Sequence, residues 1–283
     1  MPIIRPLPFL IFLIIWVEAK EAEHHSHEGS NNIKINQEFL DFTHSKKKED
    51  GTRYGIEIDH EDRHHHLQFY YERTDTHTKP IVPKDLAVNK YTVKYQYKRD
   101  VASRVSLLYT TIDDNLMEET DGGKIYGIGY DYQGVGLHQY LSDYPHFNVY
   151  QSDLRYRLQV HGVRGTLEGK YIHLQDKNSN PFSQNAKPDY ATFGVKLHTH
   201  YHGIHWGAGA YWGRRIFAVM KEGFGVQHHA MEFKESYTLG VGHHFGKRLS
   251  AHLRYSYHEA KEIVSRNDHV KVEAISINGI YRF

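Results

Sequence analysis

The chain has 283 residues, with 35 basic and 34 acidic side chains and a formal net charge of +1. This balance, without a basic arm, gives no indication of a nucleic-acid partner. The lack of cysteine excludes a disulfide-stapled secreted domain and a cysteine-anchored lipoprotein. A mean hydropathy of −0.66 counts against a membrane protein, unless only alternate residues of its strands meet lipid.

The first residues have the pattern of an export signal. Arg5 supplies a positive charge, an apolar run follows over 6–17, and 17–19 (Val-Glu-Ala) places small residues at the spacing of a signal-peptidase site. The apolar run is too short to span a bilayer comfortably. We therefore predict a signal peptide at 1–19.

The rest of the chain is predicted to be a succession of strands, because apolar and polar residues alternate with a period of two. Tyr126, Ile128 and Tyr130, for example, alternate with Gly127 and Gly129. The expected strands are 33–43, 53–60, 65–73, 91–98, 104–111, 124–132, 135–142, 148–160, 163–174, 190–201, 204–213, 230–243, 248–258 and 270–283. Twelve strands are the alternative, if the two weak segments at 135–142 and 148–160 are misassigned.

The lengths of the connections separate a barrel from a soluble sandwich. Tight turns such as 133–134 and 161–162 alternate with longer loops such as 112–123 and 214–229. Short periplasmic turns, longer external loops and an even strand count are typical of a bacterial transmembrane barrel, whereas a sandwich has no reason to keep this alternation. We predict an all-β protein, an antiparallel up-and-down barrel over 33–283.

The last strand also points to this class. Ile275, Ile277, Tyr281 and Phe283 share one face, and the chain ends on the aromatic Phe283. This resembles the closing strand of bacterial outer-membrane β-barrels, porin-like proteins in general, although no motif identifies one family. The resemblance implies a Gram-negative outer-membrane location with both termini periplasmic. It also implies outer-membrane lipid and the barrel-assembly machinery as partners, with Tyr281 and Phe283 as the assembly signal.

The polar face of the strands would line the lumen. The candidate lumen and selectivity residues are Arg155, Arg157, Arg164, Lys170, Lys196, Glu168, Lys234 and Arg254. The basic residues from 155 to 196 fall on three consecutive strands, which favours a passive channel for small hydrophilic solutes with a preference for anions. The alternative is that these charges pair with one another along the wall.

Histidine is the outlier of the composition, with 24 residues. His198, His200 and His202 share one strand face, and His205 lies across the predicted hairpin. A predicted periplasmic tail, 20–32, adds His24, His25 and His27. Imidazoles at this spacing are candidate ligands for Zn²⁺, Cu²⁺ or Ni²⁺, so a metal-handling barrel is the second hypothesis. Histidine as an amphipathic rim residue is the simpler explanation, and no other cofactor is expected.

Two further hypotheses are weaker. A structural or adhesive barrel would have a plugged lumen and would act through loops such as 74–90 or 214–229. An outer-membrane hydrolase would need a constellation such as Ser142-Asp143 with His146, or 258–259 (His-Glu) with 268–269 (Asp-His). Neither set lies in a known motif, and a chain with 24 histidines offers such pairs by chance, so no enzyme is expected.

Overall fold

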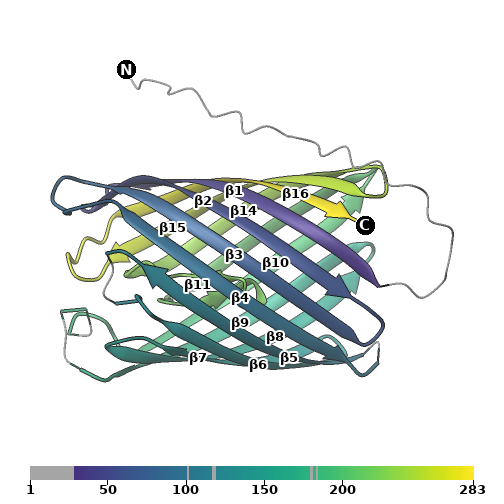
Figure 1. Ribbon diagram of the computed structural model, residues 1–283, viewed down its shortest axis with the longest axis horizontal. Helices are drawn as coiled ribbons and strands as arrows, with labels where there is room; N and C mark the ends of the chain where they lie inside the picture. Colours follow the sequence, from purple (N-terminus) through teal and green to yellow (C-terminus); the bar gives the residue numbers. More distant parts are fainter. Residues whose placement is uncertain (1–28, 101, 117–118, 179–180, 183) are drawn as a thin grey trace, which may run out of the picture.

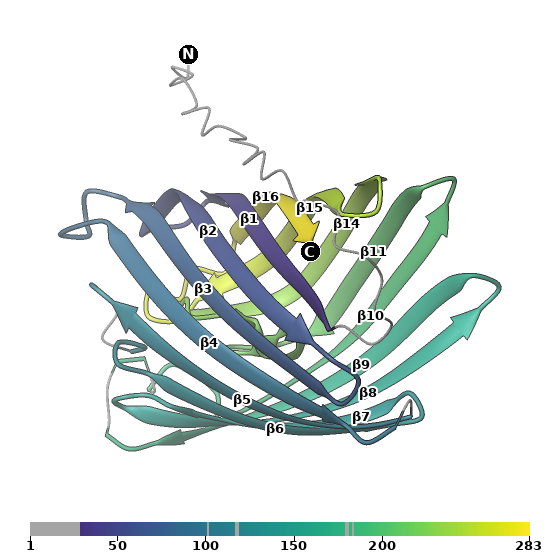
Figure 2. The same cartoon turned by 45° about the vertical axis from the view of Figure 1, so that its right-hand side comes forward.

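Fourteen antiparallel strands close into one barrel in the computed structural model, which describes residues 29–100, 102–116, 119–178, 181–182 and 184–283 (Figures 1 and 2). The barrel strands are β1 (Ser30–Thr43), β2 (Lys48–Glu61), β3 (His65–Thr78), β4 (Leu86–Lys98), β5 (Ser103–Asp114), β6 (Lys124–Tyr132), β7 (Val135–Asp143), β8 (Phe147–Val160), β9 (Val163–Asp176), β10 (Asp189–Tyr201), β11 (Ile204–Gly213), β14 (Met231–Phe245), β15 (Leu249–Glu262) and β16 (Val270–Arg282). Each strand pairs with its neighbours along the chain, and β1 pairs with β16.

The prediction of an up-and-down barrel is confirmed, with fourteen strands and not twelve. Several strands extend further than predicted at one end. β2 begins at Lys48, and β3 continues to Thr78, with Thr52 opposite Asp75. The outer face is polar in this part of the strands, so the alternation of apolar and polar residues stops there. The backbone pairing of the strands nevertheless continues. Among the described residues, no helix is long and apolar enough to cross a bilayer.

The two ends of the barrel differ. The turn end carries six short turns, the start of β1 and the end of β16 (Figure 1). The loop end carries the other connections, which are longer except at 44–47 and 144–146. Three turns are two-residue connections with positive φ at both residues: 133–134, 161–162 and 202–203. Such turns match the twist of paired strands, and glycine is the second residue of each.

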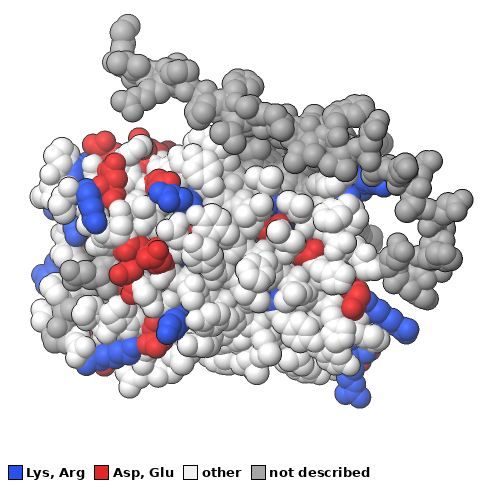
Figure 3. Space-filling view, viewed as in Figure 1, with Lys and Arg blue, Asp and Glu red and all other residues white. Residues whose placement is uncertain are grey.

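The outer face carries an apolar band. Leu154 and Leu239 at its middle are 60% and 61% exposed. Figure 3 shows that the charged side chains of the visible face gather toward the ends of the barrel and leave few in the middle. Toward the loop end the phenol of Tyr255 donates a hydrogen bond to Glu273 over 2.6 Å. An apolar band bordered by tyrosines with a polar partner is the outer surface of a transmembrane barrel.

The barrel closes between its first and last strands. Ile33 on β1 lies opposite Tyr281 on β16, and Asn31 and Phe283 exchange backbone hydrogen bonds of 3.2 and 3.0 Å. The rings of Tyr281 and Phe283 stack with centroids 6.1 Å apart, and both are exposed on the outer face. The predicted signal peptide and tail histidines, at 1–19, 24, 25 and 27, lie outside the described residues. β1 begins three residues before the predicted barrel boundary.

Candidate functional site in the barrel interior

One long connection folds into the barrel. Residues 214–230, between β11 and β14 and called the inner loop here, form the green segment inside the barrel in Figures 1 and 2. The inner loop contains a small hairpin of β12 (Val219–Met220) and β13 (Gly225–Val226), joined through the one-turn helix η1 (Lys221–Gly223). The prediction of an external loop at 214–229 is therefore wrong. This segment occupies part of the lumen.

Hydrophobic packing holds the first half of the inner loop. Ile216, Phe217, Ala218 and Val219 are buried. The ring of Phe217 lies 5.0 Å from that of Phe147 on β8, between centroids. Val226 of the inner loop belongs to the same cluster. The wall strands and the connections at the loop end contribute its other members: Leu86, Val88, Leu108, Ile112, Ile125, Tyr140, Tyr144, Phe147, Val149, Ile172, Leu174, Phe182, Tyr190 and Ile263. Each large apolar side chain buried in this way contributes about 1.5–3 kcal/mol, which explains why the loop turns inward.

Polar groups of the wall bind the backbone of the inner-loop hairpin. The Gln151 side-chain amide donates a hydrogen bond to the Val219 carbonyl and accepts one from the Val219 N–H, both over 2.8 Å. The Lys90 ammonium donates to the Val226 carbonyl over 3.2 Å. A buried backbone group left without such a partner costs about 1–3 kcal/mol. These side chains therefore fix the position of the hairpin in the lumen.

The tip of the inner loop carries a carboxylate between cations of the wall. Glu222 forms an ion pair with Arg155, lies 2.9 Å from Nη2 of Arg157 and lies 3.4 Å from Nζ of Lys94. Burial raises the pKa of Glu222, but the three cations outweigh burial and hold it well below its usual range. Glu222 is therefore ionised, and its charge fastens the tip to β4 and β8.

The backbone of the tip is strained. Lys221 and Glu222 have φ of 51° and 60°, and Gly223 has φ of 110°. Side-chain-bearing residues in this region cost of order 1–3 kcal/mol each and persist where surrounding contacts impose them. A Cβ at Gly223 would lie 2.2 Å from Cδ1 of Leu108, so the wall also requires glycine there. The Glu222 ion pairs offset this strain.

A cavity of about 640 Å³ lies at the turn end of the lumen. Its lining residues are Arg63, His64, Lys98, Arg99, Asp100, Ala102, Ser103, Arg104, Asp131, Gln133, Gly134 and Arg157. Five of them are arginine or lysine and two are aspartate, so the cavity wall is basic. Arg157 belongs both to this turn-end cavity and to the Glu222 cluster, so the cavity leads to the tip of the inner loop.

Two predicted lumen lysines, Lys170 on β9 and Lys196 on β10, are paired with acidic groups. Nζ of Lys170 lies 2.5 Å from Asp153 and 2.8 Å from Glu168. Lys196 lies 3.2 Å from Glu168, and the Tyr211 hydroxyl donates to the same carboxylate over 2.5 Å. This part of the wall therefore has the paired charges that were the alternative predicted from the sequence. Among the predicted basic residues from 155 to 196, Arg155 and Arg157 then contribute most of the positive charge at the lumen.

The other candidate lumen residues lie apart from this network. Arg164 and Arg254 are on the inward positions of β9 and β15, and Nε of Arg254 donates to the Ser276 hydroxyl over 3.3 Å. Lys234 lies where a β-bulge shifts the register of β14 between Phe233 and Glu235. Its ammonium is 2.8 Å from Asp268 in the loop before β16, so its partner is a loop residue and not the lumen wall.

The histidines at the turn end form a row of rings, not the predicted strand site. His202 occupies the β10–β11 turn with φ of 48°, so it does not continue the face of His198 and His200. Ring centroids of His205 lie 4.3 Å from those of His200 and His244, both edge to face. Within the described ranges, no three His, Cys, Asp or Glu side chains are arranged to hold a metal ion.

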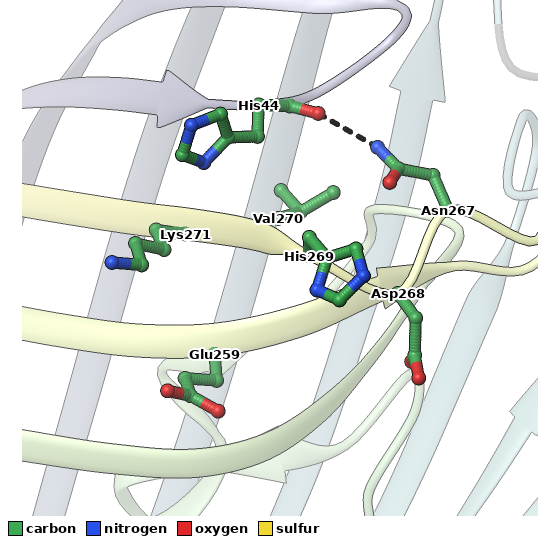
Figure 4. A pocket seen from close by; sticks show the side chains of 7 residues that line it. All are labelled: His44, Glu259, Asn267, Asp268, His269, Val270 and Lys271. Carbon is green, nitrogen blue, oxygen red and sulfur yellow. Dashed lines mark hydrogen bonds between the residues drawn. The ribbon is translucent and has the colours of Figure 1, made fainter.

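The suggested hydrolase groups do not converge. Ser142 is buried inside the barrel, whereas Asp143 pairs with Lys177 and is half-exposed. The ring of His258 bonds the Ser236 hydroxyl over 2.6 Å. Glu259, Asp268 and His269, the other members of that predicted set, instead line a pocket of about 530 Å³ at the rim of the loop end (Figure 4). That pocket is lined by His44, Glu259, Asn267, Asp268, His269, Val270 and Lys271.

Sequence reasoning missed Glu222 as a site residue, because it lies in a segment that was predicted to be an external loop. One signal was present. The run 216–220 (Ile-Phe-Ala-Val-Met) is apolar, and a loop exposed to water has no use for five such residues in succession. The run therefore indicated a segment packed against the barrel.

Comparisons with known proteins support the fold. No protein-family model matches the chain, and no curated protein matches it. The fold is similar to the CymD monoaromatic hydrocarbon channel (TM-score 0.56, 9% identity, 90% of this chain and 88% of that one). It is also similar to the toluene transporter TbuX of Ralstonia pickettii (0.53, 10%, 91% and 90%). A third similar structure is the translocator domain of the autotransporter NalP from Neisseria meningitidis (0.50, 12%, 91% and 90%).

At these identities the likeness concerns the fold. The fold is therefore that of the bacterial outer-membrane β-barrels, and the resemblance predicted from the sequence is confirmed at the level of the fold. No single family within that class is indicated.

Proposed function

We propose that this protein is an outer-membrane channel for small hydrophilic solutes, and that the inner loop controls passage through it. The observation that carries the proposal is the position of the Glu222 tip, fastened to the wall beside the basic turn-end cavity. A barrel that served only as a scaffold would need no charged, strained tip in its lumen. An apolar plug would be enough to close it.

The proposed orientation places the turn end in the periplasm and the loop end outside the cell, because bacterial barrels have short periplasmic turns and longer external loops. Both termini are then periplasmic. Outer-membrane lipid and the barrel-assembly machinery are the proposed partners. Tyr281 and Phe283 are the proposed assembly signal, supported by their exposed position at the closing strand.

Anionic solutes are the proposed preference. Arg63, Lys98, Arg99 and Arg104 line the turn-end cavity, and Arg157 continues this surface to the tip. A cleft lined by one sign of charge raises the local concentration of oppositely charged solutes. Lys170 and Lys196 are neutralised by Glu168 and Asp153 and contribute little to this field.

Planar-bilayer recording tests the proposal. The wild-type barrel should conduct weakly and with a reversal potential that favours anions. Replacement of 216–228 by a short Gly-Ser linker should raise the conductance several-fold, because it removes the plug. The same replacement of 79–85, in the β3–β4 connection, is the control and should change little. An insulating, folded barrel lacking 216–228 would reject the channel and favour a structural role.

Metal handling is not favoured by the geometry of the described histidines. The tail residues His24, His25 and His27 remain a prediction. Titration of Zn²⁺ into the folded full-length protein checks it, and the triple alanine variant should lose binding. Equal binding by the variant would reject the tail as a metal ligand.

A further inference from the structure

Three cations of the wall converge on one point of the lumen. The side chains of Lys94 on β4 and Arg155 on β8 are each 3% exposed. Arg157, also on β8, lies beside them. All three contact the Glu222 carboxylate. Two guanidinium groups and an ammonium around one carboxylate form a recognition arrangement for a carboxylate, because each guanidinium presents several fixed N–H donors.

This cluster has more donors and more charge than Glu222 uses. Nη2 of Arg155 is buried and has no hydrogen-bond partner among the described residues. Arg104 adds a fourth cation nearby, 3.5 Å from Asp131, which also lies 3.3 Å from Arg157. Four cations thus face two carboxylates, Glu222 and Asp131, and the excess positive charge favours an additional anionic group.

Glu222 is placed where a solute could replace it. Its side chain is 34% exposed, although its partners Lys94 and Arg155 are buried. Arg157 joins the cluster to the turn-end cavity, which gives a solute a path to the same atoms. The positive φ of Lys221 and Glu222 is relieved when the tip leaves, so the backbone favours release once another anion neutralises the cations.

An aromatic surface flanks the cluster. Nζ of Lys94 lies 5.2 Å from the centroid of the Phe224 ring, and the Tyr70 ring packs edge to face on Phe224 with centroids 6.0 Å apart. A solute that places its carboxylate on the cations can therefore contact these rings with its apolar part.

We infer that Lys94, Arg155 and Arg157 form a binding site for the carboxylate of a small organic anion, and that Glu222 occupies this site in the closed channel as a built-in competitor. A solute carboxylate that takes the site displaces Glu222 and frees the tip of the inner loop. The inference rests on the proposed channel function and names the chemical group that the channel recognises.

Calorimetric titration of the full-length protein in detergent micelles tests the site, with benzoate as the probe and benzamide as its neutral counterpart. Wild-type protein should bind benzoate weakly. Glu222→Gln should bind it at least tenfold more tightly, because the competing charge is removed, and should not bind benzamide. Glu57→Gln is the matched control, since Glu57 pairs with Lys34 on another part of the wall, and its affinity should stay within twofold of wild type.

Removal of either arginine should reverse the gain in benzoate affinity. In the Glu222→Gln background, Arg155→Met and Arg157→Gln should each reduce benzoate affinity at least tenfold. Arg157 is part-exposed, so its variant supplies the answer if Arg155→Met does not fold. Unchanged affinity in Glu222→Gln, equal binding of benzamide, or full binding by a folded cation variant would each overturn the site.

The two proposals fail separately, because binding in micelles requires no conduction. A barrel that conducts after removal of 216–228 but shows no effect of Glu222→Gln on benzoate binding would overturn the carboxylate site alone. A barrel that binds benzoate as expected but never conducts would keep the site and overturn the channel.

Discussion

The carboxylate of Glu222 lies 2.9 Å from the guanidinium of Arg157, which joins the tip of a loop to a wall strand 65 residues earlier in the chain. The ion pair places a negative charge at the boundary between the basic turn-end cavity and the apolar packing of the loop end. Besides the hydrogen bonds of its hairpin backbone to Gln151 and Lys90, the inner loop therefore has a buried apolar attachment and a charged one open to the lumen. The charged one is the attachment that a solute or a change of charge can break.

Gly223→Ala should loosen the tip. The added Cβ would meet Cδ1 of Leu108 at 2.2 Å and would force alanine into φ of 110°. We expect a loss of about 1–3 kcal/mol in the attachment of the tip and a higher conductance in planar bilayers. Gly225→Ala is the matched control in the same loop, because its nearest neighbour would be 3.5 Å away. Equal conductance of the two variants would contradict the prediction.

Gln151→Leu should free the hairpin backbone. The substitution removes both hydrogen bonds to Val219 and leaves a buried N–H without its partner, at a cost of about 1–3 kcal/mol. Hydrogen exchange at the Val219 amide should accelerate about tenfold or more. Gln139→Leu, whose partner is the Ser152 hydroxyl on the outer face, should leave this exchange unchanged. Equal protection in Gln151→Leu and wild type would show that apolar packing alone holds the loop.

Lys170→Met should destabilise the barrel strongly. It leaves Asp153 and Glu168, both buried, without the cation between them, and broken buried pairs cost about 3–5 kcal/mol. Lys177→Met removes the exposed pair with Asp143 and should cost less than about 1 kcal/mol. Urea unfolding in detergent, followed by tryptophan fluorescence, measures both. A loss below about 1 kcal/mol for Lys170→Met would contradict the prediction.

The turn before β5 should weaken in acid. The Asp100 carboxylate accepts hydrogen bonds from the Ser103 hydroxyl and from the N–H groups of Ala102 and Ser103, and these bonds hold the pKa of Asp100 below its usual range. Its stabilisation is therefore complete above the unfolded pKa and disappears as the pH falls through the lower folded value.

Asp100→Asn should accordingly lower the unfolding temperature at about pH 7, and this difference should shrink as the pH falls below the unfolded pKa of an aspartate, about 3.9. Gel mobility after heating measures the transition, because a folded barrel and an unfolded chain migrate differently. A difference between the variant and wild type that stays constant across this range would contradict the carboxylate's role.

The strands were predictable from sequence because their signal is local. Tyr126, Ile128 and Tyr130 face outward on β6, as their period-two spacing indicated. Arg155 and Arg157 face inward for the same reason. Two errors of the sequence-based prediction also have local causes. Lys234 is displaced by a bulge and His202 by a turn, and each interrupts the period at a single residue.

The sequence by itself determined the barrel and the polar face of its lumen, because lipid on one side and polar lumen on the other select alternate residues along each strand. It left the count between fourteen and twelve strands, which the closed sheet decided. Tertiary structure decided the direction of the inner loop and the partner of Glu222. Those depend on contacts with Phe147, Gln151 and Arg157, which lie about 65–70 residues away in the chain. No period within 214–230 encodes a partner on another strand, so only the closed barrel brings the carboxylate to its cations.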